Sequence, residues 1–146
     1  MLKAAGACII AKDTKRIILQ QRDKSGSHPR NWGFWGGKVE ENLTPIDIVE
    51  SISAYGTWLK NKSGDKKLKI VIGRDARISG EMVENLCIGT LQSLGIDVIN
   101  LGLSTTPRVE IAVPMENAHG GIILTASHNP KEWNALKLLN SKGEFI

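Results

Sequence analysis

Short apolar runs and helical patterns alternate from residue 44 onward, and this alternation limits the fold more than any other feature. Runs of strand length occupy 68–73, 96–101, 121–125 and about 135–139. Strands that alternate with helices form βαβ units, which build a largely parallel sheet with helices on both faces. The pattern therefore predicts an α/β fold with three layers, α/β/α, around a mostly parallel mixed sheet.

Caps and turn residues mark where the helices begin and end. Thr44-Pro45 supplies an N-cap and a first-turn proline, so a helix is predicted over 45–61. Ser79 is predicted to cap a second helix, which Gly95 ends. A third helix is predicted over about 107–117. Three helices are thus available to cover the two faces of the sheet.

Three loops leave the carboxyl ends of the predicted parallel strands, at 74–79, 102–106 and 126–134. Ligands of such sheets bind beyond these strand ends. The three loops are therefore expected to converge on one edge of the sheet and to form the site there.

The amino-terminal residues have a different character. Apolar runs at 4–11 and 16–21 are separated by a short polar turn, which predicts a β-hairpin. A polar loop and a short aromatic strand that begins at Trp32 follow. We expect this segment, residues 1–41, to be distinct from the domain that follows over 42–146.

Charge and composition narrow the class of protein. The 146 residues are 41% hydrophobic and 23% charged, as in soluble globular domains. Much of the net charge of +4 lies between Lys60 and Lys69, a run without the interleaved aromatic residues of a nucleic-acid groove. No apolar run reaches the length of a membrane span. Cys8 and Cys87 lie in apolar surroundings, which fits buried thiols in a reducing compartment. These features predict a cytoplasmic protein that binds neither nucleic acid nor membrane.

Ser127 stands in a polar loop directly after a buried strand. A serine that passes a phosphoryl group needs hydrogen-bond donors and cations around the phosphate. His128, Asn129 and Lys137 are suitable donors nearby in the sequence. Taken alone, however, the residues favour a simpler interpretation, in which Ser127 closes a turn with Asn129-Pro130.

Arg74 and Arg77 flank Asp75 just before the second predicted helix. We interpret the three charges as an ion-paired turn that locks the helix against the Ser127 loop. Direct contact of Arg74 and Arg77 with a substrate is the less favoured alternative.

Two sequence blocks together resemble the active-site region of the α-D-phosphohexomutases, the phosphoglucomutase/phosphomannomutase family. The first block is T-A-S-H-N-P followed by K-E-W-N-A-L-K, which contains Ser127. The second is G-R-D-A-R-I-S-G at 73–80, and the two have the order and spacing of the family. The resemblance extends over about 42–146 and corresponds to the first of the family's domains.

The resemblance implies a role for each residue of the site. Ser127 would carry the phosphate that moves between the 1 and 6 positions of a hexose phosphate, with His128 and Lys137 as catalytic partners. Asn129 and Arg74 would belong to the loops that hold substrate and phosphate. Glucose 1,6-bisphosphate would phosphorylate the serine, and phosphorylated Ser127 would be one ligand of Mg²⁺.

Other motifs of that family are missing from this sequence. A metal loop of type D-G-D-x-D-R and a sugar-binding loop of type G-E-x-S-G-H do not occur. The chain also ends at Ile146, where members of the family continue. The expectation is a truncated domain that is inactive as a mutase on its own.

Residues 1–41 resemble the start of a Nudix hydrolase instead, which would make the chain a chimera. Catalysis in that family needs a box of glutamates that bind metal, counted here from Gly37. The required positions hold Leu43, Ser51-Ile52 and Tyr55-Gly56, so the carboxylates are absent. A diphosphate hydrolase is therefore the weakest of the functional hypotheses.

Two further expectations remain open from the sequence. The chain could be catalytically silent and serve as a binding protein, in contrast to a phosphohexomutase domain. An exposed edge of the predicted sheet could also lead to self-association.

Overall fold

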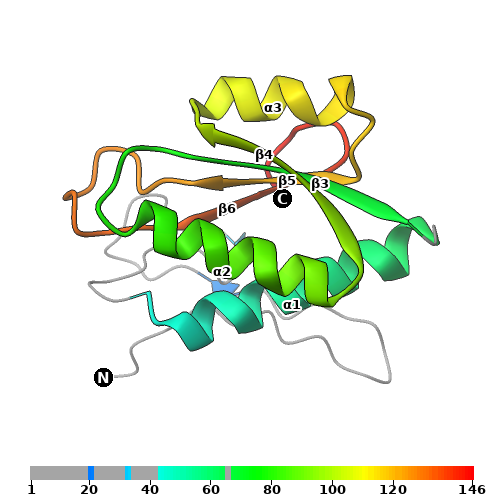
Figure 1. Cartoon of the computed structure of the whole chain (residues 1–146), viewed down its shortest axis with the longest axis horizontal. Helices are drawn as coiled ribbons and strands as arrows, with labels where there is room; N and C mark the ends of the chain where they lie inside the picture. Colours follow the sequence, from blue (N-terminus) through cyan, green and yellow to red (C-terminus); the bar gives the residue numbers. More distant parts are fainter. Residues whose placement is uncertain (1–19, 22–31, 34–42, 65–66) are drawn as a thin grey trace.

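The computed structural model describes residues 20–21, 32–33, 43–64 and 67–146, and its main body has three layers. A four-stranded sheet lies between helices α1 and α2 on one face and helix α3 on the other (Figure 1). Its strands are β3 (Leu68–Arg74), β4 (Ile96–Leu103), β5 (Gly120–Leu124) and β6 (Leu136–Leu139). The predicted α/β/α architecture is confirmed.

The sheet has the order β4-β3-β5-β6 and is mixed. β3 pairs in parallel with both β4 and β5, whereas β6 runs antiparallel to β5. β5 is buried along its whole length because it is central and covered on both faces. The antiparallel turn-back from β5 to β6 brings residues after the Ser127 loop back beside the strand that precedes it.

Helix α1 (Pro45–Ser63) begins at the predicted cap. The Asp47 amide donates to Thr44 Oγ1 at 3.2 Å, and the Thr44 amide donates to Asp47 Oδ2 at 3.0 Å. This reciprocal pair is a capping box, which satisfies two amides that a helix start otherwise leaves open. The buried face carries the apolar residues expected from helical spacing, and these are Ile48, Ile52, Tyr55 and Leu59.

Helix α2 (Gly80–Ser93) begins where predicted, but its predicted cap is wrong in one respect. Ser79 is the N-cap residue, yet its side chain makes no capping hydrogen bond. Its backbone has φ −82° and ψ −3°, which is helical, whereas a capping serine has an extended backbone. The Ser79 hydroxyl instead accepts a hydrogen bond from Asn134 at 3.2 Å.

Helix α3 (Thr106–Met115) and the strand β5 complete the second core. Val109 and Val113 of α3 pack with Val71, Ile123 and Leu139 of the sheet. The larger core lies on the other face, under α1 and α2. Both faces of the sheet are therefore covered by apolar side chains, as the two-sided burial of β3 and β5 requires.

Gly120 in β5 allows α1 to lie close to the sheet. The Tyr55 hydroxyl donates to the Leu139 carbonyl oxygen at 2.7 Å and lies 3.2 Å from that of Gly121. A Cβ atom at Gly120 would collide with this hydroxyl and lie 2.8 Å from the Leu139 oxygen. The absence of a side chain at Gly120 is thus what lets Tyr55 link helix, β5 and β6.

The described part of the amino-terminal segment is small. β1 (Gln20–Gln21) pairs antiparallel with β2 (Trp32–Gly33). The two strands form a separate two-stranded sheet. The rest of the hairpin predicted over 4–21, and of the Nudix-like segment 1–41, lies outside the described residues. Among the helices that the structure does describe, none is long and apolar enough to cross a bilayer.

Candidate functional site

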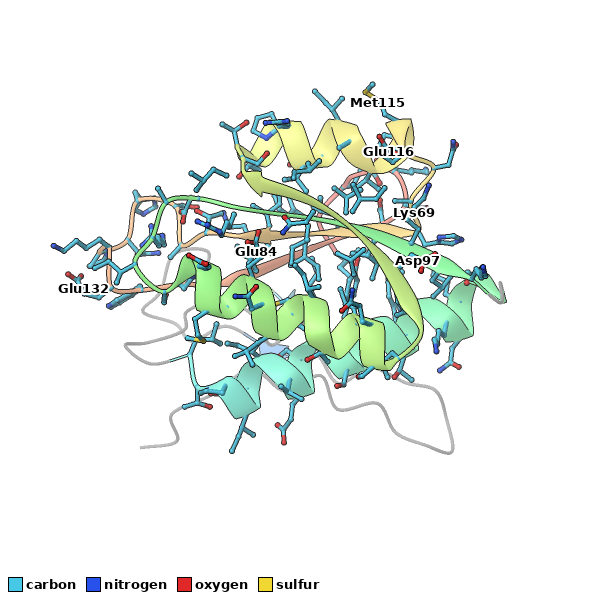
Figure 2. The ribbon with its side chains drawn as sticks, in the orientation of Figure 1. Lys69, Glu84, Asp97, Met115, Glu116 and Glu132 are labelled. Carbon is cyan, nitrogen blue, oxygen red and sulfur yellow. The ribbon has the colours of Figure 1, made fainter. Side chains whose placement is uncertain are left out.

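The three loops beyond the strand ends do converge, as predicted from the parallel sheet. The Ser104 amide donates to the Arg74 carbonyl oxygen at 2.8 Å, and the Asp75 amide donates to that of Leu124 at 3.0 Å. Arg77 bonds to the loop between β5 and β6, residues 125–135, which we name the serine loop. In Figure 2, Glu132 marks the outer tip of this loop, at the opposite end of the sheet from Lys69 and Asp97.

Ser127 is exposed and lies at the start of the serine loop in a left-handed backbone conformation, with φ 55°. Its amide donates to Thr125 Oγ1 at 3.0 Å. A non-glycine residue with positive φ is uncommon and is held only where its surroundings fix it. Thr125 was not among the predicted site residues, because a threonine two residues before a serine forms no recognisable sequence motif.

Lys137 is brought to Ser127 by strand pairing. It lies on β6 opposite Ile123 of β5, and its Nζ donates to Ser127 Oγ at 2.6 Å. The antiparallel return from the serine loop thus places a cation ten residues later in sequence directly on the hydroxyl. This is the pair of predicted site residues that the structure brings into contact.

Asn129 and His128 have different surroundings. The Asn129 amide and its side-chain Nδ2 both donate to the Ala126 carbonyl oxygen, at 3.1 and 2.8 Å. Asn129 therefore shapes the loop, which agrees with its frequent role in turns. His128 is exposed beside Ser127, and no side-chain partner for it occurs among the described residues.

Arg74 points to helix α2 and not to the serine loop. Its Nε donates to Glu84 Oε2 at 3.1 Å, and its Nη1 donates to the Asp75 carbonyl oxygen at 3.4 Å. Figure 2 shows Glu84 between α2 and the sheet. The Arg74 side chain is 18% exposed, so its contact with Glu84 is a partly buried ion pair. Of the predicted site residues, it is the one that the structure places in a structural pair.

Asn134 closes the other end of the serine loop. It is buried, and its Nδ2 donates to Ser79 Oγ at 3.2 Å while its Oδ1 accepts from the Ala135 amide at 2.9 Å. This contact joins the serine loop to the N-cap residue of α2. The Ser79 hydroxyl thus connects the two sequence blocks and does not cap the helix.

The described residues do not supply a full set of ligands for the magnesium ion that the family resemblance implies. A Mg²⁺ ion needs an octahedron of oxygen ligands with carboxylates among them. Within the described ranges, no group of three or more acidic, histidine or cysteine side chains could hold a metal. Ser127 Oγ offers one oxygen, and the ammonium group of Lys137 lies against it. The described part of the chain therefore does not fit a complete magnesium site.

Comparison with known proteins identifies the family of the chain. The family described as "Phosphoglucomutase/phosphomannomutase, alpha/beta/alpha domain I" matches residues 35–146, so the match begins somewhat before the boundary predicted at 42. A phosphoglucomutase/phosphomannomutase of Thermococcus kodakarensis is 43% identical over 107 residues, 73% of this chain and 23% of the relative. A phosphoglucosamine mutase of Alkaliphilus oremlandii is 36% identical over 107 residues, 73% and 24% of the two chains.

Solved structures give the same result. A phosphoglucomutase/phosphomannomutase family protein from Burkholderia thailandensis superimposes with a TM-score of 0.61 at 25% identity, covering 75% of this chain and 25% of the other. This chain therefore spans about a quarter of the length of the relatives it matches. On the family match and the sequence identity together, the chain belongs to the phosphoglucomutase/phosphomannomutase family, in the region of its α/β/α domain I.

Proposed function

We propose that this chain is the phosphoserine-bearing part of a phosphohexomutase, and that Ser127 accepts and returns the phosphoryl group. The observation that carries the proposal is the 2.6 Å contact between Lys137 Nζ and Ser127 Oγ, in an exposed loop at the carboxyl edge of a parallel sheet. The family membership points to the same chemistry. The names of the relatives indicate sugar phosphates, with glucose, mannose or glucosamine as the sugar.

The contact suits Ser127 Oγ as the leaving group. When the phosphate moves from serine to sugar, the P–Oγ bond breaks, and a Lys137 ammonium that already donates to Oγ can transfer a proton to it. In the opposite direction the neutral Lys137 amine that this transfer leaves would accept the serine proton as Oγ forms the bond to phosphorus. The bond from phosphorus to the sugar oxygen would break, and that oxygen would regain a proton from the group that had served as general base. The ammonium charge also lies where the phosphate oxygens would be.

His128 is our candidate for the general base that accepts the proton of the sugar hydroxyl. The hydroxyl that attacks phosphorus has to lose a proton, and an imidazole titrates in the right range for a general base. His128 is exposed and adjacent to Ser127 in the sequence, so its side chain is open to solvent next to the serine. Asn129 shapes the loop, and Arg74 would act through the turn that it shares with Asp75.

The phosphoryl donor in the test is glucose 1,6-bisphosphate. Intact mass spectrometry of the folded chain after incubation should show a gain of one phosphate, mapped by peptide analysis to Ser127. Ser127→Ala should abolish the gain, whereas Ser141→Ala, which removes an exposed serine of the 140–143 turn, should retain it. A folded wild-type chain that gains no phosphate would rule out the proposal and favour the alternative of a catalytically silent or binding protein.

Several finer points belong to the same proposal. We expect negligible interconversion of hexose 1- and 6-phosphates by the 146-residue chain alone, because the described residues supply one magnesium ligand at most. We also expect no hydrolysis of nucleoside diphosphates, since Leu43 and Ser51-Ile52 replace the carboxylates of a Nudix box. The Nudix resemblance of residues 1–41, the cytoplasmic location and self-association through a sheet edge remain predictions.

A further inference from the structure

The Arg77 side chain uses all of its hydrogen-bonding capacity within the protein. A guanidinium group has five N–H donors. Nε donates to Asp75 Oδ2 at 3.0 Å. Nη1 donates to the carbonyl oxygens of Pro130 and Trp133, and Nη2 to those of Ser127 and Asn129. The side chain is 8% exposed, so these bonds are made in a largely desolvated place.

Four carbonyl oxygens of the serine loop therefore converge on one cation. Their negative ends would repel one another if the guanidinium group were absent, and the carbonyl oxygens of Ser127, Asn129 and Trp133 would lose their donor. Within the loop itself, backbone hydrogen bonds close two short turns, from Asn129 to Ala126 and from Trp133 to Pro130, and a third joins the loop ends, from Thr125 to Ala135. The conformation of the loop thus depends on Arg77 more than on its own backbone.

Arg77 is in turn fixed to the strand from which the loop departs. Asp75 Oδ1 accepts from the Arg77 amide at 3.2 Å while Oδ2 holds Nε. The Asp75 amide donates to the carbonyl oxygen of Leu124, the last residue of β5. These contacts connect the end of β5 through Asp75 and Arg77 to the serine loop. The position of the loop is therefore fixed relative to the strand that precedes it.

Ser127 is held at three atoms as a result. Its amide bonds to Thr125, its carbonyl oxygen to Arg77 Nη2 at 2.7 Å, and its Oγ to Lys137. Arg77 and Lys137 thus contact opposite ends of a residue whose φ is 55°, a conformation that is unfavourable for a serine without support. Removing the carbonyl contact frees this residue to relax away from Lys137.

We propose that Arg77 is the positioning residue of the site, which sets the left-handed conformation of Ser127 and so directs its hydroxyl to Lys137. The effect of Arg77 on phosphorylation rests on the proposed phosphoryl transfer. Its effect on the conformation of the serine loop does not. Arg77 touches neither the reacting atoms nor a substrate in this account. Lysine should not replace it, because a single ammonium has three donors from one point and cannot span four carbonyl groups.

Two readouts test the proposal on the whole chain. The first is amide hydrogen exchange in residues 126–134, which reports local opening and needs no phosphoryl donor. The second is the initial rate of Ser127 phosphorylation by glucose 1,6-bisphosphate. The variants are Arg77→Ala, Arg77→Lys and Asp75→Asn, and millimolar methylguanidinium is added to Arg77→Ala for chemical rescue.

Two matched controls separate positioning from general stability. Thr44→Ala removes the capping box of α1 and lowers stability by about 1 kcal/mol, without contact to the loop. Arg108→Lys makes the same chemical change at an exposed residue of α3. Both controls should keep wild-type exchange in the loop and wild-type phosphorylation.

Arg77→Ala and Arg77→Lys should lose protection in the serine loop by about tenfold while β5 stays protected, and phosphorylation should slow by about 10- to 100-fold. Methylguanidinium should restore part of the rate in Arg77→Ala. If Arg77→Ala does not fold, Arg77→Lys and Asp75→Asn decide by the same readouts. Loop protection equal to that of Thr44→Ala would overturn the inference. If wild type accepts no phosphate, the proposed function fails, and the exchange result alone supports or overturns the positioning role.

Discussion

Ser127 combines an uncommon backbone with an exposed hydroxyl, and both are features of a site more than of a simple turn. Its φ is 55°, and among the described non-glycine residues only Asn117 also has a positive φ. Asparagine adopts this region readily, because its side chain hydrogen-bonds locally, whereas serine has less reason to. Strained residues that persist in a fold tend to mark functional loops.

The strain at Ser127 can be measured by two substitutions. Ser127→Gly and Ser127→Ala both remove the contact with Lys137, but glycine adopts positive φ freely. We expect Ser127→Gly to be more stable than Ser127→Ala by about 1 kcal/mol in urea unfolding. Equal stability of the two variants, or a more stable alanine variant, would show that the backbone is unstrained there.

Cys87 predicts how stability depends on alkaline pH. Burial and, to a smaller extent, the nearby Glu84 charge together raise the pKa of its thiol from 9.0 to about 12. The unfolded chain therefore releases the thiol proton first as pH rises. The stability due to a neutral Cys87 is complete below pH 9.0 and is lost as pH rises toward about 12.

The matching variant is Cys87→Ala, which has no thiol to ionise. Between about pH 8 and 10 its free energy of unfolding should fall less than that of wild type, by about 1 kcal/mol. Urea unfolding at a series of pH values measures both slopes. Parallel slopes in the two proteins would contradict the assigned burial of the thiol.

At the scale of elements, the sequence predicted those features that depend on contacts between residues close together in the chain. The helix at 45–61 was predicted from Thr44-Pro45 and extends to Ser63, because capping and helical spacing are short-range. The cap at Ser79 was wrong because its partner, Asn134, is distant in sequence. The contacts of Arg77 with residues fifty positions later were beyond any spacing rule. The interpretation of Arg74 to Arg77 as a structural turn did anticipate their ion pairs.

The approach of α1 to β5 predicts opposite effects for two glycine substitutions. Gly120→Ala should lower stability by about 3 kcal/mol, because its Cβ would meet the Tyr55 hydroxyl and a backbone oxygen. Gly89→Ala is the matched control at an exposed position of α2, where an added Cβ meets nothing within 4 Å. It should raise stability by about 0.5–1 kcal/mol. Thermal unfolding of both variants checks the pair, and an unchanged Gly120→Ala protein would contradict the close packing.

At the scale of the whole molecule, three layers bring distant sequence blocks to one edge. The parallel strands β3 and β5 place the Arg77 turn and the serine loop side by side, and β6 returns Lys137 to them (Figure 1). The chain covers about a quarter of its relatives' length, and its described residues hold no group of three or more acidic, histidine or cysteine side chains that could bind a metal. What the described residues hold complete is the serine, its cation and the loop that orients both.

The rate at which Ser127 becomes phosphorylated tests this account most directly. Wild type, Lys137→Met and Lys137→Arg are each incubated with glucose 1,6-bisphosphate, and the phosphorylated fraction at Ser127 is followed by mass spectrometry. Because Lys137 Nζ lies 2.6 Å from Ser127 Oγ, the methionine variant should react at least about tenfold more slowly, with partial recovery in Lys137→Arg. Equal rates in wild type and Lys137→Met, with phosphate on Ser127 in both, would contradict the central claim that these two residues act as a phosphoryl-transfer pair.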